Sequence, residues 1–268
     1  MDYVTSRDET KIAYERSGSG PPVVLIASAL PDRGDAKLLA RHLSQHFTVL
    51  NYDRRGRGSS GDTAPYQVAR EVEDIDALIE AAGGSASALG SSSGAVLALD
   101  AANALGEKVT RLALFEPPFI VDDTRPPITA DDVRRVEEST SAGRRGEAVK
   151  NFLTRHLGMP TAMITVMRLL PTWSRLKKLA PTLPYDLDLM KGTQSGAPLP
   201  SRWPSVSAAT LVLAGEKSDT YLQNAGRALV DVLPTATYTV VPGANHAAVV
   251  AAPKRLAAAM VEFLQDDD

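Results

Sequence analysis

The chain has 268 residues, of which 44% are hydrophobic and 23% are charged, and its formal net charge is −3. This composition predicts a globular protein that can bury a sizeable core. The charge balance offers no basic surface for nucleic acid or anionic lipid, and the lack of cysteine excludes disulfides, thiolate catalysis and zinc–thiolate sites. A polar amino terminus, with no apolar run of about 20 residues anywhere, predicts a cytoplasmic protein with no membrane contact.

Short apolar runs alternate with segments of helical periodicity along most of the chain. The runs predict strands over Lys11–Glu15, Pro22–Ile26, Phe47–Tyr52, Ser85–Leu89, Arg111–Phe115, Thr210–Ala214 and Thr237–Val241. The periodic segments predict helices over Ala36–His46, Val68–Ala82, Ala95–Leu105, Tyr221–Leu233 and Pro253–Leu264. Nearly continuous apolar strands are typical of a parallel sheet that is covered on both faces. The alternation therefore predicts an α/β fold with a doubly wound, mostly parallel sheet, whose ligand sites lie at the carboxyl ends of its strands.

The alternation stops between about Val121 and Pro204. This region contains several amphipathic segments separated by proline and glycine, and no convincing strand. We interpret residues 121–204 as a helical lid that is inserted into a core formed by residues 1–120 and 205–268.

Three consecutive serines follow the fourth predicted strand. Residues Gly90 to Gly94 fit the pattern G-x-S-x-G with Ser92 at its centre, between a predicted strand and a predicted helix. A sharp turn there lifts the central side chain out of the sheet, and small flanking residues let the helix approach closely. The next N–H, on Ser93, then points to where an oxyanion would develop. The alternative is an ordinary glycine–serine loop that caps the helix.

Four segments, in this order, resemble those of the α/β-hydrolase family. Tyr52–Asp62 (YDRRGRGSSGD) is similar to the family's D-x-R-G-x-G-x-S turn, and Gly90–Gly94 to its serine elbow. Leu114–Phe119 (LFEPPF) closes the strand before the lid, and Val241–His246 (VPGANH) is similar to the histidine loop. The resemblance covers most of the chain. It implies the α/β-hydrolase fold and a triad in the chain order nucleophile, acid, histidine.

A serine hydroxyl needs an adjacent base to act as a nucleophile. Among the four histidines of the chain, the resemblance assigns this role to His246, which follows a predicted strand and precedes the last helix. His42 and His46 fall in a predicted helix and His156 falls in the lid, where a packing role is more typical.

Two residues are candidates for the acid of the triad. The family commonly places it as G-x-x-D after the strand that follows the lid, and here Asp219 comes one residue late after Gly215. Asp219 also precedes a capping-box pattern, so a helix-start charge is the alternative. Glu116 ends the strand RLALF, where some family members carry the acid, and Pro117 predicts an extended backbone there. A buried carboxylate that accepts hydrogen bonds from loop amides is the alternative for Glu116. We favour Glu116 over Asp219 and retain both as candidates.

The loop after the second predicted strand departs from the family's pattern. The family often has H-G-x there, whereas this chain has Ala27-Ser28-Ala29-Leu30-Pro31. Because the oxyanion donor is a backbone N–H, Ala29 or Leu30 can supply it, but Pro31 cannot. We assign the second oxyanion donor to Ala29, and we expect Ser28 and Leu30 to contact the substrate. A hydrogen bond to its own loop is the alternative for Ser28.

Apolar residues at and beyond the start of the lid are candidates for an apolar substrate site. They include Phe119, Met163 and Trp173. Packing of the lid against the sheet is the alternative role for each of them.

Together these features predict a serine hydrolase that cleaves an ester, thioester or lactone of a mostly apolar small molecule through an acyl-enzyme on Ser92. The chemistry requires no metal or organic cofactor, and nucleic acid and membrane are not expected partners. A lyase, acyl transferase or cyclase is an alternative, because a fold does not dictate its reaction. A small-ligand binding protein with an idle triad is a further alternative.

Overall fold

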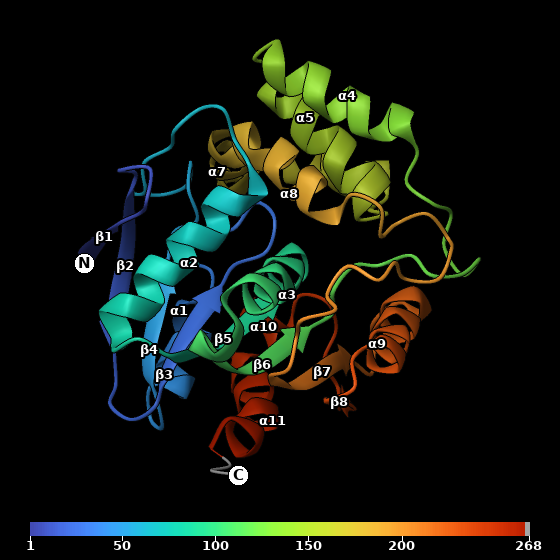
Figure 1. Cartoon of the computed structure of the whole chain (residues 1–268). Coiled ribbons are helices and arrows are strands. Elements are labelled where there is room, and N and C mark those ends of the chain that lie inside the picture. The colour runs from blue at the N-terminus through green and yellow to red at the C-terminus, as the bar shows by residue number, and fades with distance from the viewer. Residues whose placement is uncertain (266–268) are drawn as a thin grey trace.

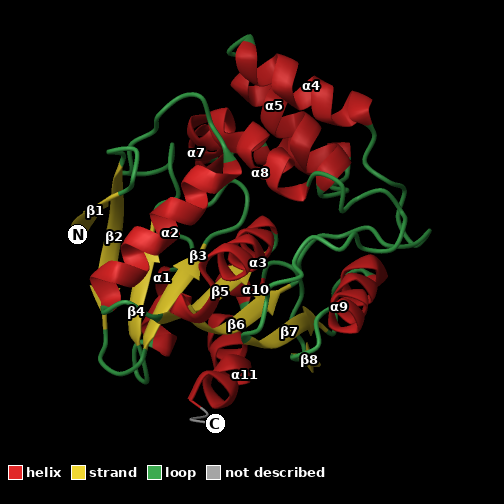
Figure 2. Ribbon diagram, viewed as in Figure 1, coloured by secondary structure: helices red, strands yellow, loops and turns green. Residues whose placement is uncertain are grey.

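A central sheet with helices on both faces organises the computed structural model, which describes residues 1–265 (Figures 1 and 2). In this part of the chain the sheet has eight strands in the order β1-β2-β4-β3-β5-β6-β7-β8. The strands are β1 (Asp2–Thr5), β2 (Lys11–Ser17), β3 (Pro22–Ile26), β4 (Thr48–Tyr52), β5 (Ala86–Ser91), β6 (Val109–Phe115), β7 (Ala209–Gly215) and β8 (Ala236–Val241). The β1–β2 and β2–β4 pairs are antiparallel and the remaining pairs are parallel. The predicted α/β fold with a mostly parallel sheet is confirmed.

The short edge strand β1 was not predicted. Its residues are mostly exposed, so it lacks the apolar run that marks the inner strands.

Two layers of helices cover the sheet. One face is packed by α2 (Val68–Ala82), α3 (Ser93–Leu105) and α9 (Thr220–Val232), and the other by α1 (Lys37–Leu43), α10 (Ala248–Ala251) and α11 (Pro253–Gln265). A short 3-10 turn, η1 (Gly106–Lys108), follows α3.

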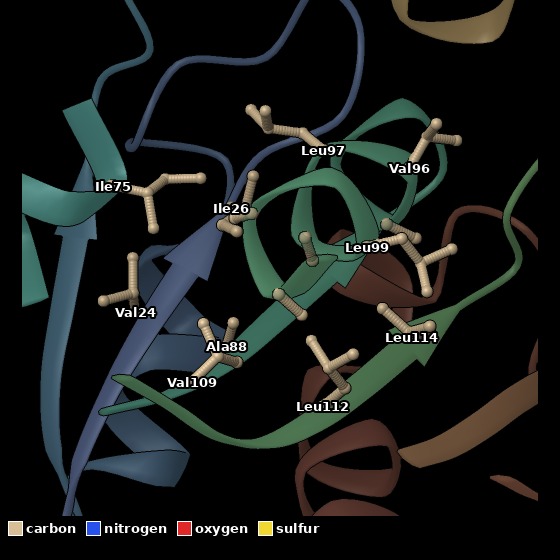
Figure 3. Packing of buried hydrophobic residues seen from close by; sticks show 14 of the residues in the cluster. Val24, Ile26, Ile75, Ala88, Val96, Leu97, Leu99, Val109, Leu112 and Leu114 are labelled. Atoms are coloured by element: carbon tan, nitrogen blue, oxygen red, sulfur yellow. The ribbon is translucent and has the colours of Figure 1, made fainter. Parts of the chain in front are cut away.

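Successive side chains of one strand point alternately to the two faces of the sheet. In β3, Val24 and Ile26 pack towards α2 and α3 and meet Ile75 (Figure 3), whereas Val23 and Leu25 pack on the opposite face. Burial on both faces explains why the inner strands are apolar without interruption.

The chain between β6 and β7, residues 116–208, contains helices between residues 130 and 190, and we call it the β6–β7 segment. It contains α4 (Ala130–Ser141), α5 (Arg145–Asn151), the π-helical turn η2 (Phe152–His156), α6 (Thr161–Met167), α7 (Pro171–Leu179), the 3-10 turn η3 (Ala180–Thr182) and α8 (Leu183–Met190). The helices α4, α5, α7 and α8 lie together beyond one end of the sheet (Figure 1). The domain bounds 121–204 and the function as a lid stay predictions. Within residues 1–265, no helix is both long and apolar enough to cross a membrane.

Candidate active site

Ser92 occupies a strained turn between β5 and α3. Its backbone has φ 52° and ψ −125°, a conformation that non-glycine residues rarely adopt. A Cβ atom on Gly90 would lie 2.3 Å from the carbonyl oxygen of Gly94, and one on Gly94 would lie 2.5 Å from that of Ile26. Only glycine therefore fits on either side, and the Ser92 N–H is held by a 2.9 Å hydrogen bond to the Phe115 carbonyl.

His246 lies in the loop between β8 and α10 and pairs with Glu116, the residue after β6. The His246 Nδ1 and Glu116 Oε2 atoms are 2.6 Å apart. Glu116 is fully buried, and its Oε1 accepts a 2.6 Å hydrogen bond from the Gly215 N–H. Because a carboxylate only accepts hydrogen bonds, Nδ1 carries the proton in this pair and Nε2 is left as the basic nitrogen.

The backbone of Glu116 differs from the extended conformation that Pro117 predicts. Its φ is 50°, so this prediction is wrong. The surrounding structure holds the residue at both ends: its N–H donates to the Leu213 carbonyl at 2.9 Å, and its carboxylate binds Gly215 and His246. Several simultaneous hydrogen bonds can maintain such a strained conformation.

Asp219, the other candidate acid, is exposed at the start of α9. It lines a surface groove together with Arg125 and Tyr221. The structure thus brings Glu116, and not Asp219, to His246.

Ser92 and His246 line one cavity of about 140 Å³ together with Ser28 and Ala29. Among the described residues its wall is mostly apolar, and Asp35 is its one acidic side chain. Besides Ala29, the apolar lining residues are Leu25, Ile26, Ala27, Pro31, Ala36, Phe115, Leu157, Ala247, Val249 and Val250.

Four residues that were predicted to contact substrate do not line this cavity in the described part of the chain. Phe119 is buried in the main core with its ring centroid 5.5 Å from that of Trp203. Leu30 and Trp173 are buried in the apolar cluster of the β6–β7 segment, and Met163 is 54% exposed on α6. Apolar periodicity identifies side chains that become buried, but it does not identify the surface against which they pack.

A buried ionic cluster beside Ser93 joins Arg54 and Arg57 to Glu71 of α2 and Asp186 of α8, and it was not predicted. Arg54 forms a bidentate pair with Glu71, with hydrogen bonds of 2.6 and 2.7 Å, and donates a 2.7 Å hydrogen bond to Asp186. Arg57 meets the other oxygen of Asp186 at 2.6 Å. The Ser93 hydroxyl donates a 2.8 Å hydrogen bond to Asp186.

The neighbours of Asp186 in the cluster favour its ionised form despite its burial. Burial raises the pKa of Asp186, but Arg57, Arg54 and the Ser93 hydroxyl outweigh it, so the net pKa is below the ordinary value. The run RRGR is a local sign of a cationic cluster, whereas the partner of Arg57 lies 129 residues further along the chain and has no local signature.

Comparisons with known proteins point to one family. The model of the alpha/beta hydrolase family matches residues 23–259. A segment is 34% identical over 110 residues to the uncharacterized hydrolase YraK of Bacillus subtilis and covers 40% of this chain and 41% of that protein, less than half of each.

Solved structures agree over nearly the whole chain. An alpha/beta hydrolase from Sphaerobacter thermophilus is 46% identical, with a TM-score of 0.89 over 98% of this chain and 99% of that one. An esterase from Thermogutta terrifontis is 21% identical (TM-score 0.74, 98% and 97% covered), and an enol-lactonase from Burkholderia xenovorans is 19% identical (TM-score 0.75, 99% and 100% covered). Since the family model matches most of its length, the chain belongs to the alpha/beta hydrolase family.

Proposed function

We propose that the protein is a serine hydrolase that cleaves a carboxylic ester, thioester or lactone of a small, mostly apolar molecule through an acyl-enzyme on Ser92. The observation that carries this proposal is the pairing of His246 with the buried Glu116, 2.6 Å apart, at the cavity that Ser92 also lines. The pairing turns the basic Nε2 into a general base for a serine hydroxyl.

In the acylation step the Ser92 Oγ bonds to the carbonyl carbon and its proton passes to His246 Nε2. The electron pair of the carbonyl π bond moves to oxygen, and the N–H groups of Ser93 and Ala29 hold the resulting oxyanion. The position of Ser93 as the first residue of α3 adds the positive end of the helix dipole. When the intermediate collapses, the leaving group takes the proton from His246.

Deacylation repeats these steps with water in place of the serine. His246 takes a proton from water, which attacks the acyl carbon, and the acid product leaves as the Ser92 hydroxyl is restored. Throughout, the Glu116 carboxylate keeps the imidazole oriented and stabilises its cationic form. No step requires a metal or an organic cofactor.

The cavity supports a short, apolar acyl group. Its volume of about 140 Å³ is below the roughly 300–1,000 Å³ of common ligand sites, and its wall is mostly apolar. Two proteins of similar fold are named an esterase and an enol-lactonase, which agrees with chemistry at a carboxylic acyl carbon.

Intact-mass analysis after treatment with a fluorophosphonate tests the nucleophile. We expect one adduct on the wild type and none on Ser92→Ala, while Ser91→Ala, changed at the neighbouring serine, still acquires it. A panel of ester, thioester and lactone substrates with acyl chains of increasing length then defines the substrate. A folded wild type that acquires no adduct would contradict the proposal.

A further inference from the structure

The peptide unit that joins Ser28 to Ala29 is held by Arg57. The Arg57 Nη1 donates a 2.5 Å hydrogen bond to the Ser28 carbonyl and lies 3.4 Å from that of Pro31. This peptide bond is trans, so its carbonyl and its N–H point in opposite directions. A guanidinium that fixes the Ser28 carbonyl therefore also fixes the direction of the Ala29 N–H, which points away from Arg57.

Arg57 is itself held rigidly by the β6–β7 segment. Its Nη2 donates to Asp186 Oδ2 at 2.6 Å and its Nε donates to Thr182 Oγ1 at 3.1 Å. Arg57 and Asp186 are both almost completely buried. A planar guanidinium with several fixed acceptors has little freedom to shift.

The same carboxylate also contacts the residue that follows Ser92. Asp186 Oδ1 accepts a 2.8 Å hydrogen bond from the Ser93 hydroxyl. One buried side chain is thus connected to both proposed oxyanion donors, directly to Ser93 and through Arg57 to the Ser28–Ala29 peptide. The adjacent backbone is strained at Leu30, with φ 71°, so this loop needs such an anchor.

We propose that Arg57 and Asp186 are positioning residues that align the Ala29 and Ser93 N–H groups on the oxyanion. This inference rests on the proposed function. Oxyanion donors are effective because they are already oriented before charge develops. A small displacement of these donors therefore lowers the catalytic rate strongly. Because Asp186 belongs to α8, the β6–β7 segment supplies part of the alignment of the catalytic apparatus.

Arg55 provides a matched control. It is as buried as Arg57 and is also paired with acidic residues, Asp74 at 2.7 and 2.8 Å and Asp8 at 3.0 Å. Its other hydrogen bond among the described residues is donated to the Arg70 carbonyl, so none of these bonds reaches the Ser28–Ala29 loop. Replacing Arg55 by lysine therefore disturbs a buried ion pair without touching the oxyanion loop.

The test compares kcat, KM and denaturant stability for the wild type, Arg57→Lys, Ser93→Ala and Arg55→Lys, with a short-chain ester as substrate. A lysine at position 57 keeps the charge but cannot span Asp186 and the Ser28 carbonyl together. We expect Arg57→Lys to lower kcat by about 100-fold with little change in KM. Ser93→Ala, which removes one hydroxyl and leaves the ion pairs in place, lowers kcat less. Arg55→Lys loses stability and keeps its kcat.

An unchanged kcat in folded Arg57→Lys, or an equal loss of kcat in Arg55→Lys, overturns the inference. If Arg57→Lys does not fold, Ser93→Ala decides, and an unchanged kcat in that variant overturns it. Failure of the proposed function is distinguishable, because the wild type itself would then acquire no fluorophosphonate adduct.

Discussion

Glu116 and His246 are 130 residues apart in the chain and meet with 2.6 Å between Oε2 and Nδ1. Glu116 follows β6, the strand next to β5, and the residues before Ser92 and Glu116, Ser91 and Phe115, are partners in the sheet. The carboxylate and the serine therefore leave the sheet side by side at its carboxyl edge. This arrangement makes the acid of the proposed triad testable.

Replacement of Glu116 by glutamine is expected to lower kcat by about 10²- to 10⁴-fold, because the imidazole loses its orienting carboxylate and the partner of its cationic form. Steady-state hydrolysis of a short-chain ester measures the effect. Asp219→Asn, a change of the same kind at the exposed start of α9, should retain most of the activity. A larger decrease in kcat for Asp219→Asn than for Glu116→Gln would assign the acid to Asp219.

Leu157 is the residue of the β6–β7 segment that lines the cavity among those described. Truncation in Leu157→Ala enlarges the cavity, so kcat/KM for a hexanoyl ester relative to an acetyl ester should rise by roughly tenfold or more. Leu169→Ala is the control, since Leu169 belongs to the same segment but is 85% exposed. A constant ratio of hexanoyl to acetyl hydrolysis in Leu157→Ala would place the acyl chain elsewhere.

His156 should make stability depend on pH. The residue is buried and stacks on Phe152, with ring centroids 5.1 Å apart, and burial lowers its pKa from 6.5 to about 4. The nearby Asp132 raises the pKa, and Arg125 and Arg155 lower it. Between these two pKa values the unfolded chain binds more protons than the folded one. The free energy of unfolding therefore decreases as pH falls from 6.5 to about 4, by up to about 3 kcal/mol.

Urea unfolding at several pH values between 4.5 and 7.5 measures this slope. His156→Leu should flatten it, whereas His46→Gln, at an exposed histidine, should leave it unchanged. An equally steep slope in His156→Leu would assign the dependence to other groups.

Gly94 should not tolerate a side chain. A Cβ there would lie 2.5 Å from the Ile26 carbonyl oxygen and 2.6 Å from that of Ala27, so Gly94→Ala must push α3 away from the end of β3. We expect a loss of about 1–3 kcal/mol in the free energy of unfolding, together with lower activity. Gly146→Ala in α5 is the control, because its nearest neighbour atom is 3.6 Å away. Equal stability of the two variants would argue against the close approach.

Most of the strands, the helices that flank the sheet and the serine turn could be predicted because each has a local signature, whereas the histidine loop was identified by its resemblance to the family's. Buried strands are continuously apolar, helices repeat with their own period, and the glycines on either side of Ser91–Ser93 mark a turn with no room for a Cβ. The edge strand β1 was not predicted, because an exposed edge strand does not need an apolar run. These features depend on neighbours in the sequence, so the sequence alone determined them.

The tertiary structure alone decided which partners meet. Glu116 and Asp219 were both plausible acids, and the hydrogen bonds to Gly215 and His246 select Glu116 as the partner of the imidazole. The sequence shows that Phe119 is apolar, but only the packing shows that its ring lies against Trp203. The contact between Arg57 and Asp186 joins residues 129 positions apart. Such pairings depend on how distant segments pack in space, and neither periodicity nor a short motif records that distance.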